Sequence, residues 1–463
     1  MSALTVYLLL NGGASLLFSL IFTVDMIYQV TVVGLSPLQL VLVGTTLEAT
    51  AFLFEIPTGV LADVKSRRLS IIIGYLLTGV AFVVEGAFPL FGTVLLAQVL
   101  WGLGYTFTSG ATEAWIADEV GPERAGEAFV QGSQAARIGG LVAIPLSIAA
   151  GSLNVRLPIV AGGLLFLGLA GFLALAMREE GFQPTPPGER STWGHMWRTV
   201  QDARGLVGRQ PVLLALLGIG LFYGLYSEGL DRLWTPHLLE SYPAPWGGVL
   251  TPVIWLGGLR GVVAIAGLGA MELARRHLVT RPARVLGRLL MANSALIVAG
   301  VALLGLAPAL WLAMLAYGLV ATLRGVAAPL QQAWYNRRID DAQVRATLFS
   351  VTSQVDALGQ IGGGPLMGVV GNVSVRAALV VSAALLVPVL PLYRIAIRRE
   401  TDGTRMIPDG CRANCRISPT SPKAIETILG RVSLIIPDGC RANCQICPTS
   451  PQPSRRYWAG YLC

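Results

Sequence analysis

The feature that most constrains this chain is a succession of apolar stretches that fill residues 1 to about 396 between short polar loops. Each stretch is near the length of about 20 residues that a helix needs to cross a hydrocarbon core about 30 Å thick. Inside lipid, only helices and closed β-barrels satisfy every backbone hydrogen bond, and barrel strands alternate in polarity over about ten residues. The run Pro158–Met177 shows no alternation. The sequence therefore predicts an all-α polytopic membrane protein.

We expect twelve membrane helices, with approximate bounds 5–33, 39–61, 69–88, 89–113, 128–150, 156–177, 211–235, 250–270, 285–306, 308–329, 346–370 and 374–396. The first run lacks a preceding basic segment and is too long for a signal peptide, so we read it as a helix. Basic residues gather in the loops after even-numbered runs, including Lys65, Arg67, Arg68, Arg178, Arg190, Arg275, Arg276, Arg337 and Arg338. Cytoplasmic loops carry this excess, which predicts cytoplasmic termini and a multi-pass protein of the cytoplasmic (inner) membrane.

The longest internal loop separates two sets of six runs. We predict an N-terminal six-helix bundle at 1–178, a cytoplasmic central loop at 179–210, a C-terminal six-helix bundle at 211–396 and a tail at 397–463. Within the loop, residues 192–206 have the spacing of an amphipathic helix on the membrane surface. The halves echo each other, because the pairs Gly139-Gly140 and Gly362-Gly363 occur at corresponding runs. Parallel six-helix repeats with a site between them are a known transporter plan.

The loop after the second run carries a recognisable motif, Gly59-Val60-Leu61-Ala62-Asp63-Val64-Lys65-Ser66-Arg67-Arg68. It resembles the signature loop between the second and third helices of the major facilitator superfamily, although Val64 and Ser66 depart from that pattern. The resemblance implies that Asp63 and Arg67 belong to a charge network that locks the two halves together on the cytoplasmic side. We therefore treat Gly59, Asp63, Arg67 and Arg68 as a cytoplasmic gate motif. The alternative is that the arginines only fix the topology.

Ionisable side chains inside apolar runs are functional candidates, because each costs about 2.5–3.5 kcal/mol to insert at a helix centre. The proton-coupling candidates are Asp25, Glu48, Glu55 and Glu113, of which Glu48 and Glu55 lie two turns apart on one helix face. The alternative is that Glu48 and Glu55 are each held in a structural pair by a neighbouring arginine such as Arg137, and the charge-pair candidates are Arg137, Asp231, Arg232 and Asp356. We expect Glu85, Asp231, Arg232 and Arg260 to lie near interfaces, where they would merely be solvated.

A central cavity is implied by the family resemblance, since the first, fourth, seventh and tenth helices of that superfamily line one. The candidates carried over by helix are Asn11, Gln98, Trp101, Tyr105, Tyr223, Tyr226, Glu228, Tyr317 and Arg324. Aromatic walls with a few polar groups suit a partly apolar organic solute. The alternative is that Tyr223, Tyr226 and Trp234 form an interfacial aromatic belt, which we expect for Trp234. Gln98 stands where many proton-linked exporters of this superfamily carry an arginine.

The tail has a composition of its own, because all six cysteines lie in it. Residues 407–422 and 436–451 are identical except for Arg416/Gln445 and Ser418/Cys447, which indicates a recent duplication. We expect this tail to be disordered and dispensable, with metal binding and redox or partner contacts as alternatives. No metal site is predicted within the membrane region, and no standard zinc-finger spacing occurs.

The expected function is secondary active transport of a small organic solute by alternating access, with proton-coupled efflux as the leading form. Nutrient uptake and a non-transporting membrane receptor or scaffold are the alternatives. The chain has a net charge of +8 but carries its arginines in loops between apolar runs, so we expect no nucleic-acid partner. An enzyme is not expected, and neither is a cofactor; the partners would be membrane lipids and the solute, and the chain would act as a monomer driven by a proton gradient.

Overall fold

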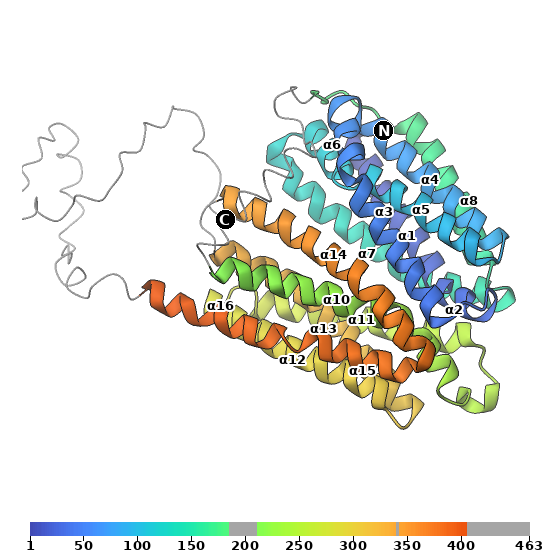
Figure 1. The fold of residues 1–463 in the computed structure, drawn as a ribbon. Helices are drawn as coiled ribbons and strands as arrows, with labels where there is room; N and C mark the ends of the chain where they lie inside the picture. Colours follow the sequence, from blue (N-terminus) through green and yellow to red (C-terminus); the bar gives the residue numbers. More distant parts are fainter. Residues whose placement is uncertain (185–210, 339–341, 405–463) are drawn as a thin grey trace, which may run out of the picture. The chain divides into compact units, whose positions relative to one another are not determined.

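The computed structural model describes residues 1–184, 211–338 and 342–404, and this part of the chain is helical (Figure 1). Before the central loop, here called the first half, lie α1 (Ala3–Phe22), α2 (Asp25–Thr31), α3 (Pro37–Val64), α4 (Arg67–Ala87), α5 (Phe91–Thr108), α6 (Ala111–Val120), α7 (Pro122–Leu153) and α8 (Leu157–Ala176). After it, in the second half, lie α10 (Pro211–Glu240), the 3-10 turn η1 (Pro245–Gly248), α11 (Pro252–His277), α12 (Ala283–Leu306), α13 (Leu310–Arg338), α14 (Ala342–Val373), α15 (Val375–Leu386) and α16 (Val389–Thr404).

Eleven helical segments in the described residues are long and apolar enough to cross a membrane. They correspond in order to eleven of the twelve expected runs. The remaining expected run, 346–370, falls on α14, which has 32 residues but a more polar composition, with Asp356 and several glutamines. The chain is thus an all-helical polytopic membrane protein with eleven to twelve spans.

The expected bounds differ from the observed helices in two ways. Both α7 and α14 have 32 residues and begin well before the apolar runs that predicted them, because polar turns extend them beyond the apolar core. Three expected spans are each divided into two helices, at residues 23–24, 109–110 and 387–388. At the second of these breaks Gly110 has φ +71°, a backbone conformation that favours glycine.

Local signals in the sequence explain where several helices begin. Ser36 caps α3 by accepting from the backbone N–H of Gln39, whose side chain accepts in return from the Ser36 N–H. Ser66 caps α4 in a similar way through Leu69. Such caps satisfy N–H groups that the first helical turn leaves without partners.

Glycines of α7 and α14 allow close helix packing in each half. At Gly139 of α7, an added Cβ would meet the backbone of Gly12 in α1. At Gly363 of α14, it would meet the backbone of Leu225 in α10. Figure 1 shows α14 beside α10, and these two helices pack extensively, as α1 and α7 do. Small residues at helix crossings permit this approach in membrane proteins. The close approach falls on the first glycine of one pair and on the second glycine of the other, so the two pairs do not make equivalent contacts.

The two halves meet mainly through α3 with α14 and α7 with α11. At one end of these helices, the Leu38 N–H donates to Asn372 Oδ1 at 3.0 Å. At the same end, a side chain at Gly151 would touch Val253 across the other contact. Toward the opposite end of α3, Gln354 Nε2 donates to Glu55 at 2.8 Å. Within the described residues, the close packing between the halves therefore lies mostly at the end that carries residues 32–37 and 372–374.

The predicted amphipathic helix at 192–206 lies outside the described residues. The cysteine-containing repeats lie outside them as well, so those two predictions stay predictions.

Candidate functional site

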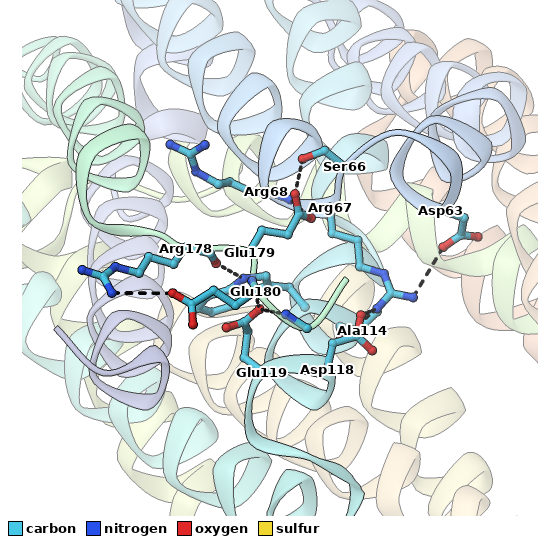
Figure 2. A network of polar contacts seen from close by, with 12 residues as sticks. Asp63, Ser66, Arg67, Arg68, Ala114, Asp118, Glu119, Arg178, Glu179 and Glu180 are labelled. Atoms are coloured by element: carbon cyan, nitrogen blue, oxygen red, sulfur yellow. Dashed lines mark hydrogen bonds and ion pairs between the residues drawn. The ribbon is translucent and has the colours of Figure 1, made fainter. Parts of the chain in front are cut away.

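A network of charges surrounds Arg67 at the start of α4 (Figure 2). Its guanidinium forms an ion pair with Asp118 of α6, donates to the Ala114 carbonyl at 3.1 Å and lies 4.0 Å from Asp63. It also lies over the ring of Phe182, 5.7 Å from the centroid. Arg67 therefore fastens α3, α4, α6 and the segment after α8 to one another.

The segment after α8 completes this network with carboxylates. Glu179 accepts from Ser66 Oγ at 2.5 Å and from the Arg68 N–H at 3.0 Å, which adds a second cap to α4. Glu119 accepts from the N–H groups of residues 180 and 181 at 2.7 and 2.8 Å (Figure 2). The Arg68 side chain donates to the Ala174 carbonyl.

In the described residues, the partners of Asp63, Arg67 and Arg68 all belong to the first half. The expectation that the gate motif locks the two halves together therefore stays a prediction. Gly59 lies in α3 with open space around it. The acidic partners Asp118, Glu119 and Glu179 were missed, because they are distant in sequence from the motif.

A cavity of about 590 Å³ lies between the halves. Its wall in the first half comes from α1 and α7, and its wall in the second half from α11 and α13. The lining residues are Asn11, Ala14, Ser15, Phe18, Ser19, Phe22, Thr23, Ala136, Ile144, Arg260, Val263, Ala264 and Tyr317. A volume of this size is within the range of about 300–1,000 Å³ that small-molecule sites occupy.

Of the nine cavity candidates, the structure places Asn11 and Tyr317 in this lining. Trp101 lies behind it, 5.0 Å from Phe22 between ring centroids. Tyr105, which lies one turn after Trp101 near the C-terminal end of α5, is 54% exposed. Tyr317 stacks on Trp234 at 3.9 Å, so Trp234 packs against the cavity wall instead of forming part of an interfacial belt.

A second polar cluster is completely enclosed in the first half. Asp25 begins α2, and Glu85 is 0% exposed near the end of α4. Gln29 Nε2 donates to both carboxylates, at 3.1 Å to Asp25 and 2.9 Å to Glu85. Gln98 Nε2 donates to Glu85 at 3.4 Å, and Tyr28 donates to the Glu85 carbonyl at 2.6 Å. The expectation that Glu85 is solvated was wrong, because α2, α4 and α5 enclose it.

Among the described residues, three oxygens of this enclosed cluster find no hydrogen-bond partner: Asp25 Oδ1, Gln29 Oε1 and Gln98 Oε1. Two carboxyl groups thus share one amide donor, and neither forms an ion pair within 4.0 Å among the described residues. Burying such a pair fully ionised is costly, since an isolated charge loses its hydration in an apolar interior.

A third cluster lies where α10 meets α3. Arg232 Nε lies 3.6 Å from the carboxylate of Glu228, one turn earlier on the same helix. Gly44 of α3 faces this ion pair so closely that a Cβ there would meet both side chains. The Arg232 charge also acts on Glu48, which is half-buried on α3. Arg232, and not the suggested Arg137, is therefore the arginine close to Glu48.

The neighbouring residues on α10 have different partners. Asp231 forms a bidentate ion pair with Arg324 of α13, with Arg324 Nη2 at 2.9 Å from Asp231 Oδ2. Arg324 also lies over the Tyr226 ring at 5.7 Å. Tyr223 pairs with Ser294 of α12 at 2.7 Å between hydroxyl oxygens. Tyr223, Tyr226, Glu228 and Arg324 thus contact other side chains of the protein and are not among the residues that line the described cavity. The Tyr226 hydroxyl has no hydrogen-bond partner among the described residues.

The remaining candidates lie apart from these clusters. Glu55, Glu113 and Arg137 are exposed, and Asp356 accepts from Gln360 on its own helix at 2.8 Å. Glu48 and Glu55 do share α3, but the structure shows no hydrogen bond between them in the described residues.

The surroundings of two residues were not foreseen from the sequence. Glu85, near the end of its apolar run, is fully buried, and Arg260 lines the cavity; both were expected to be solvated. A usable signal was present for the buried cluster, because Asp25 and Gln29 are spaced by four residues and share a helix face. Among the described residues, no group of three or more His, Cys, Asp or Glu side chains could hold a metal ion.

Comparison with known proteins places these features in a family. Residues 4–364 match the profile of the Major Facilitator Superfamily. The chain is 23% identical over 381 residues to the uncharacterized MFS-type transporter YxaM of Bacillus subtilis (strain 168), covering 77% of this chain and 87% of that protein.

Solved structures agree in fold. A bacterial homolog of the human lysosomal transporter Spinster, in an inward-facing, unoccupied conformation, aligns with a TM-score of 0.64 and 18% identity over 86% of this chain and 96% of that one. The nucleoside transporter NupG aligns with a TM-score of 0.68 and 12% identity, over 86% and 99%. The resemblance drawn from the signature loop is confirmed: this chain belongs to the major facilitator superfamily and is a multi-pass secondary transporter, not an enzyme.

Proposed function

We propose that this chain is a proton-coupled carrier that moves a small organic solute by alternating access, and that Asp25 and Glu85 hold the coupling proton. The enclosed carboxyl pair is the observation that carries the proposal. Both groups accept from one Gln29 amide, and both are buried. One proton shared between them removes most of the cost of burying two charges side by side.

The position of this pair next to the cavity supports coupling. Thr23 and Phe22 line the cavity immediately before Asp25 begins α2, and Trp101, which packs on Phe22, is three residues from Gln98 on α5. A change in the break between α1 and α2 would therefore alter both the solute site and the carboxyl pair. Loss of the proton and movement of the solute would be linked through this short segment.

The arrangement of the halves supports one conformational state in the cycle. Close packing lies at the end with residues 32–37, while the Arg67 network at the other end stays within the first half. Taken with the basic loops, this corresponds to an inward-open carrier with cytoplasmic termini. In the opposite state, the Arg67 network would meet the second half, as the family resemblance implies. We further propose that the chain resides in the cytoplasmic membrane, acts as a monomer and exports its solute.

The test uses full-length protein in liposomes that contain a pH-sensitive dye. A library of small organic solutes is presented with and without an imposed proton gradient. Wild-type protein is expected to accumulate at least one solute against its gradient and to move protons with it. Asp25→Asn and Glu85→Gln should still exchange solute at equilibrium but should lose gradient-driven accumulation.

The matched control is Glu113→Gln, because Glu113 is exposed and belongs to α6. It should behave as wild type. Glu48→Gln and Glu55→Gln test, in the same accumulation assay, whether the two candidate carboxylates on α3 contribute to proton coupling. Accumulation that survives both Asp25→Asn and Glu85→Gln, or that follows a sodium gradient and ignores the proton gradient, contradicts the proposal.

A further inference from the structure

Arg260 has an unusual position for a membrane-embedded arginine. It lies on α11, and it is the one charged side chain among the described residues that line the central cavity. No carboxylate lies within 4.0 Å of it among the described residues. A cation in an apolar surrounding is costly, so such residues almost always face a cavity or a partner and mark a substrate or ion path.

Neighbouring arginines of the second half show the contrast. Arg232 has Glu228 at 3.6 Å, and Arg324 has the two oxygens of Asp231. Both charges are therefore neutralised by the protein itself. Arg260 interacts instead with the uncharged hydroxyl of Tyr317, a residue that also lines the cavity.

The carboxylate of Asp25 does not neutralise Arg260 as Glu228 and Asp231 neutralise the other two arginines. Asp25 interacts electrostatically with Arg260, but it is 3% exposed and hydrogen-bonded to Gln29 in the enclosed cluster. Thr23 and Phe22 belong to the wall of both the cavity and the small space beside Arg260. The guanidinium thus remains available to a group that enters from the cavity.

The opposite wall of the cavity is aromatic. Phe18 and Phe22 of α1 lie parallel, with centroids 5.8 Å apart and an interplanar angle of 1°. On the side of Arg260, Tyr317 of α13 presents a further ring, held by its stacking on Trp234. Asn11, Ser15 and Ser19 of α1 add uncharged polar groups to the lining. A flat apolar body would lie against the phenyl rings while an acidic group reached the guanidinium.

We infer that the cavity takes an organic anion, a molecule with one carboxylate or similar acidic group and an aromatic or apolar body. Arginine suits this recognition because its planar guanidinium offers paired donors that match the two oxygens of a carboxylate. The inference rests on the proposed function, since it names the class of solute for the same cavity. Arg260 would bind the acidic group, and Tyr317 would orient both.

The test is equilibrium binding to purified full-length protein by calorimetry. The probes are matched pairs of an aromatic acid and its neutral amide: benzoate and benzamide, 1-naphthoate and 1-naphthamide, indole-3-acetate and indole-3-acetamide. At least one acid is expected to bind about tenfold or more tightly than its amide, as a charge-assisted hydrogen bond requires. Arg260→Gln should abolish this preference, while Arg260→Lys should keep part of it.

The matched control is Arg276→Gln on the same helix, because Arg276 is exposed and pairs with Glu272 outside the cavity. It should retain the full preference. The Arg260→Lys variant keeps the charge, so it separates loss of recognition from loss of folding. Equal binding of acids and amides, absence of binding by every acid, or an unchanged preference in Arg260→Gln overturns the inference.

Flux measurements keep the two proposals apart. Acids that bind through Arg260 but are not moved by a proton gradient would refute the proposed function and leave the anion site standing. Proton-driven transport of neutral or cationic solutes alone would refute the anion site and leave the proposed function standing.

Discussion

Replacing Gly363 by alanine tests the packing of the second half most directly. An alanine Cβ at this position would meet the backbone of Leu225, with its Cα at 2.8 Å and its carbonyl carbon at 2.9 Å. Real Cβ atoms do not approach backbone atoms so closely, so α14 must move away from α10. Overpacking of this kind costs about 1–3 kcal/mol. The preceding residue, Gly362, faces open space, and Gly362→Ala provides a control in the same helix.

The comparison isolates the steric cost. Alanine stabilises a helix relative to glycine by about 1 kcal/mol, and this gain is common to both variants, so it cancels in their difference. The apparent melting temperature of Gly363→Ala should fall several degrees below that of Gly362→Ala. Intrinsic tryptophan fluorescence during heating reports it, since the chain contains 10 tryptophans. Equal melting temperatures, or a more stable Gly363→Ala, would refute the close approach of α10 and α14.

Three further substitutions test other contacts by the same melting assay. Asp231→Asn removes the carboxylate that holds Arg324 and should cost about 1 kcal/mol or less, because both side chains are partly exposed, and exchanging the two residues should recover stability. Gly44→Leu should cost about 1–3 kcal/mol more than Gly59→Leu on the same helix, since only the first meets the ion pair of α10; similar values for both would contradict this contact. Glu179→Gln weakens the hydrogen bonds at the start of α4 and should cost about 1 kcal/mol, and an unchanged melting temperature would show that this cap contributes nothing.

Helix existence and order could be predicted from the sequence, because a span is encoded locally in its length and apolarity. Helix ends were less predictable, as α7 shows by beginning at Pro122. Its first turns are polar, so hydropathy does not register them. The family followed from the loop around Asp63 and Arg67, where several side chains stand at fixed spacing.

The candidate site was harder to predict, because burial depends on neighbours that are remote in sequence. Glu85 looks like an interfacial residue until α2 and α5 are placed around it. Asp231 and Arg232 are adjacent in the chain, yet helix geometry directs one to Arg324 and the other to Glu228. Residues carried over by helix number fared unevenly, because the described cavity lining includes Asn11 and Tyr317 but no residue of α5, the helix that carries Tyr105.

The end of the molecule that carries residues 32–37 and 372–374, where the halves pack closely, has few directional bonds between the halves. In the described residues, one hydrogen bond joins the halves there, from Leu38 to Asn372, and the rest of that contact is made by small and apolar groups around Gly151, Gly257 and Gly368. Separating such surfaces breaks little directional bonding and mainly admits water between apolar groups, at about 25 cal/mol per Å². The main free-energy cost of separating the halves at this end is therefore the hydration of apolar surface. A ligand that favours one state by a few kcal/mol can shift the populations of the two states.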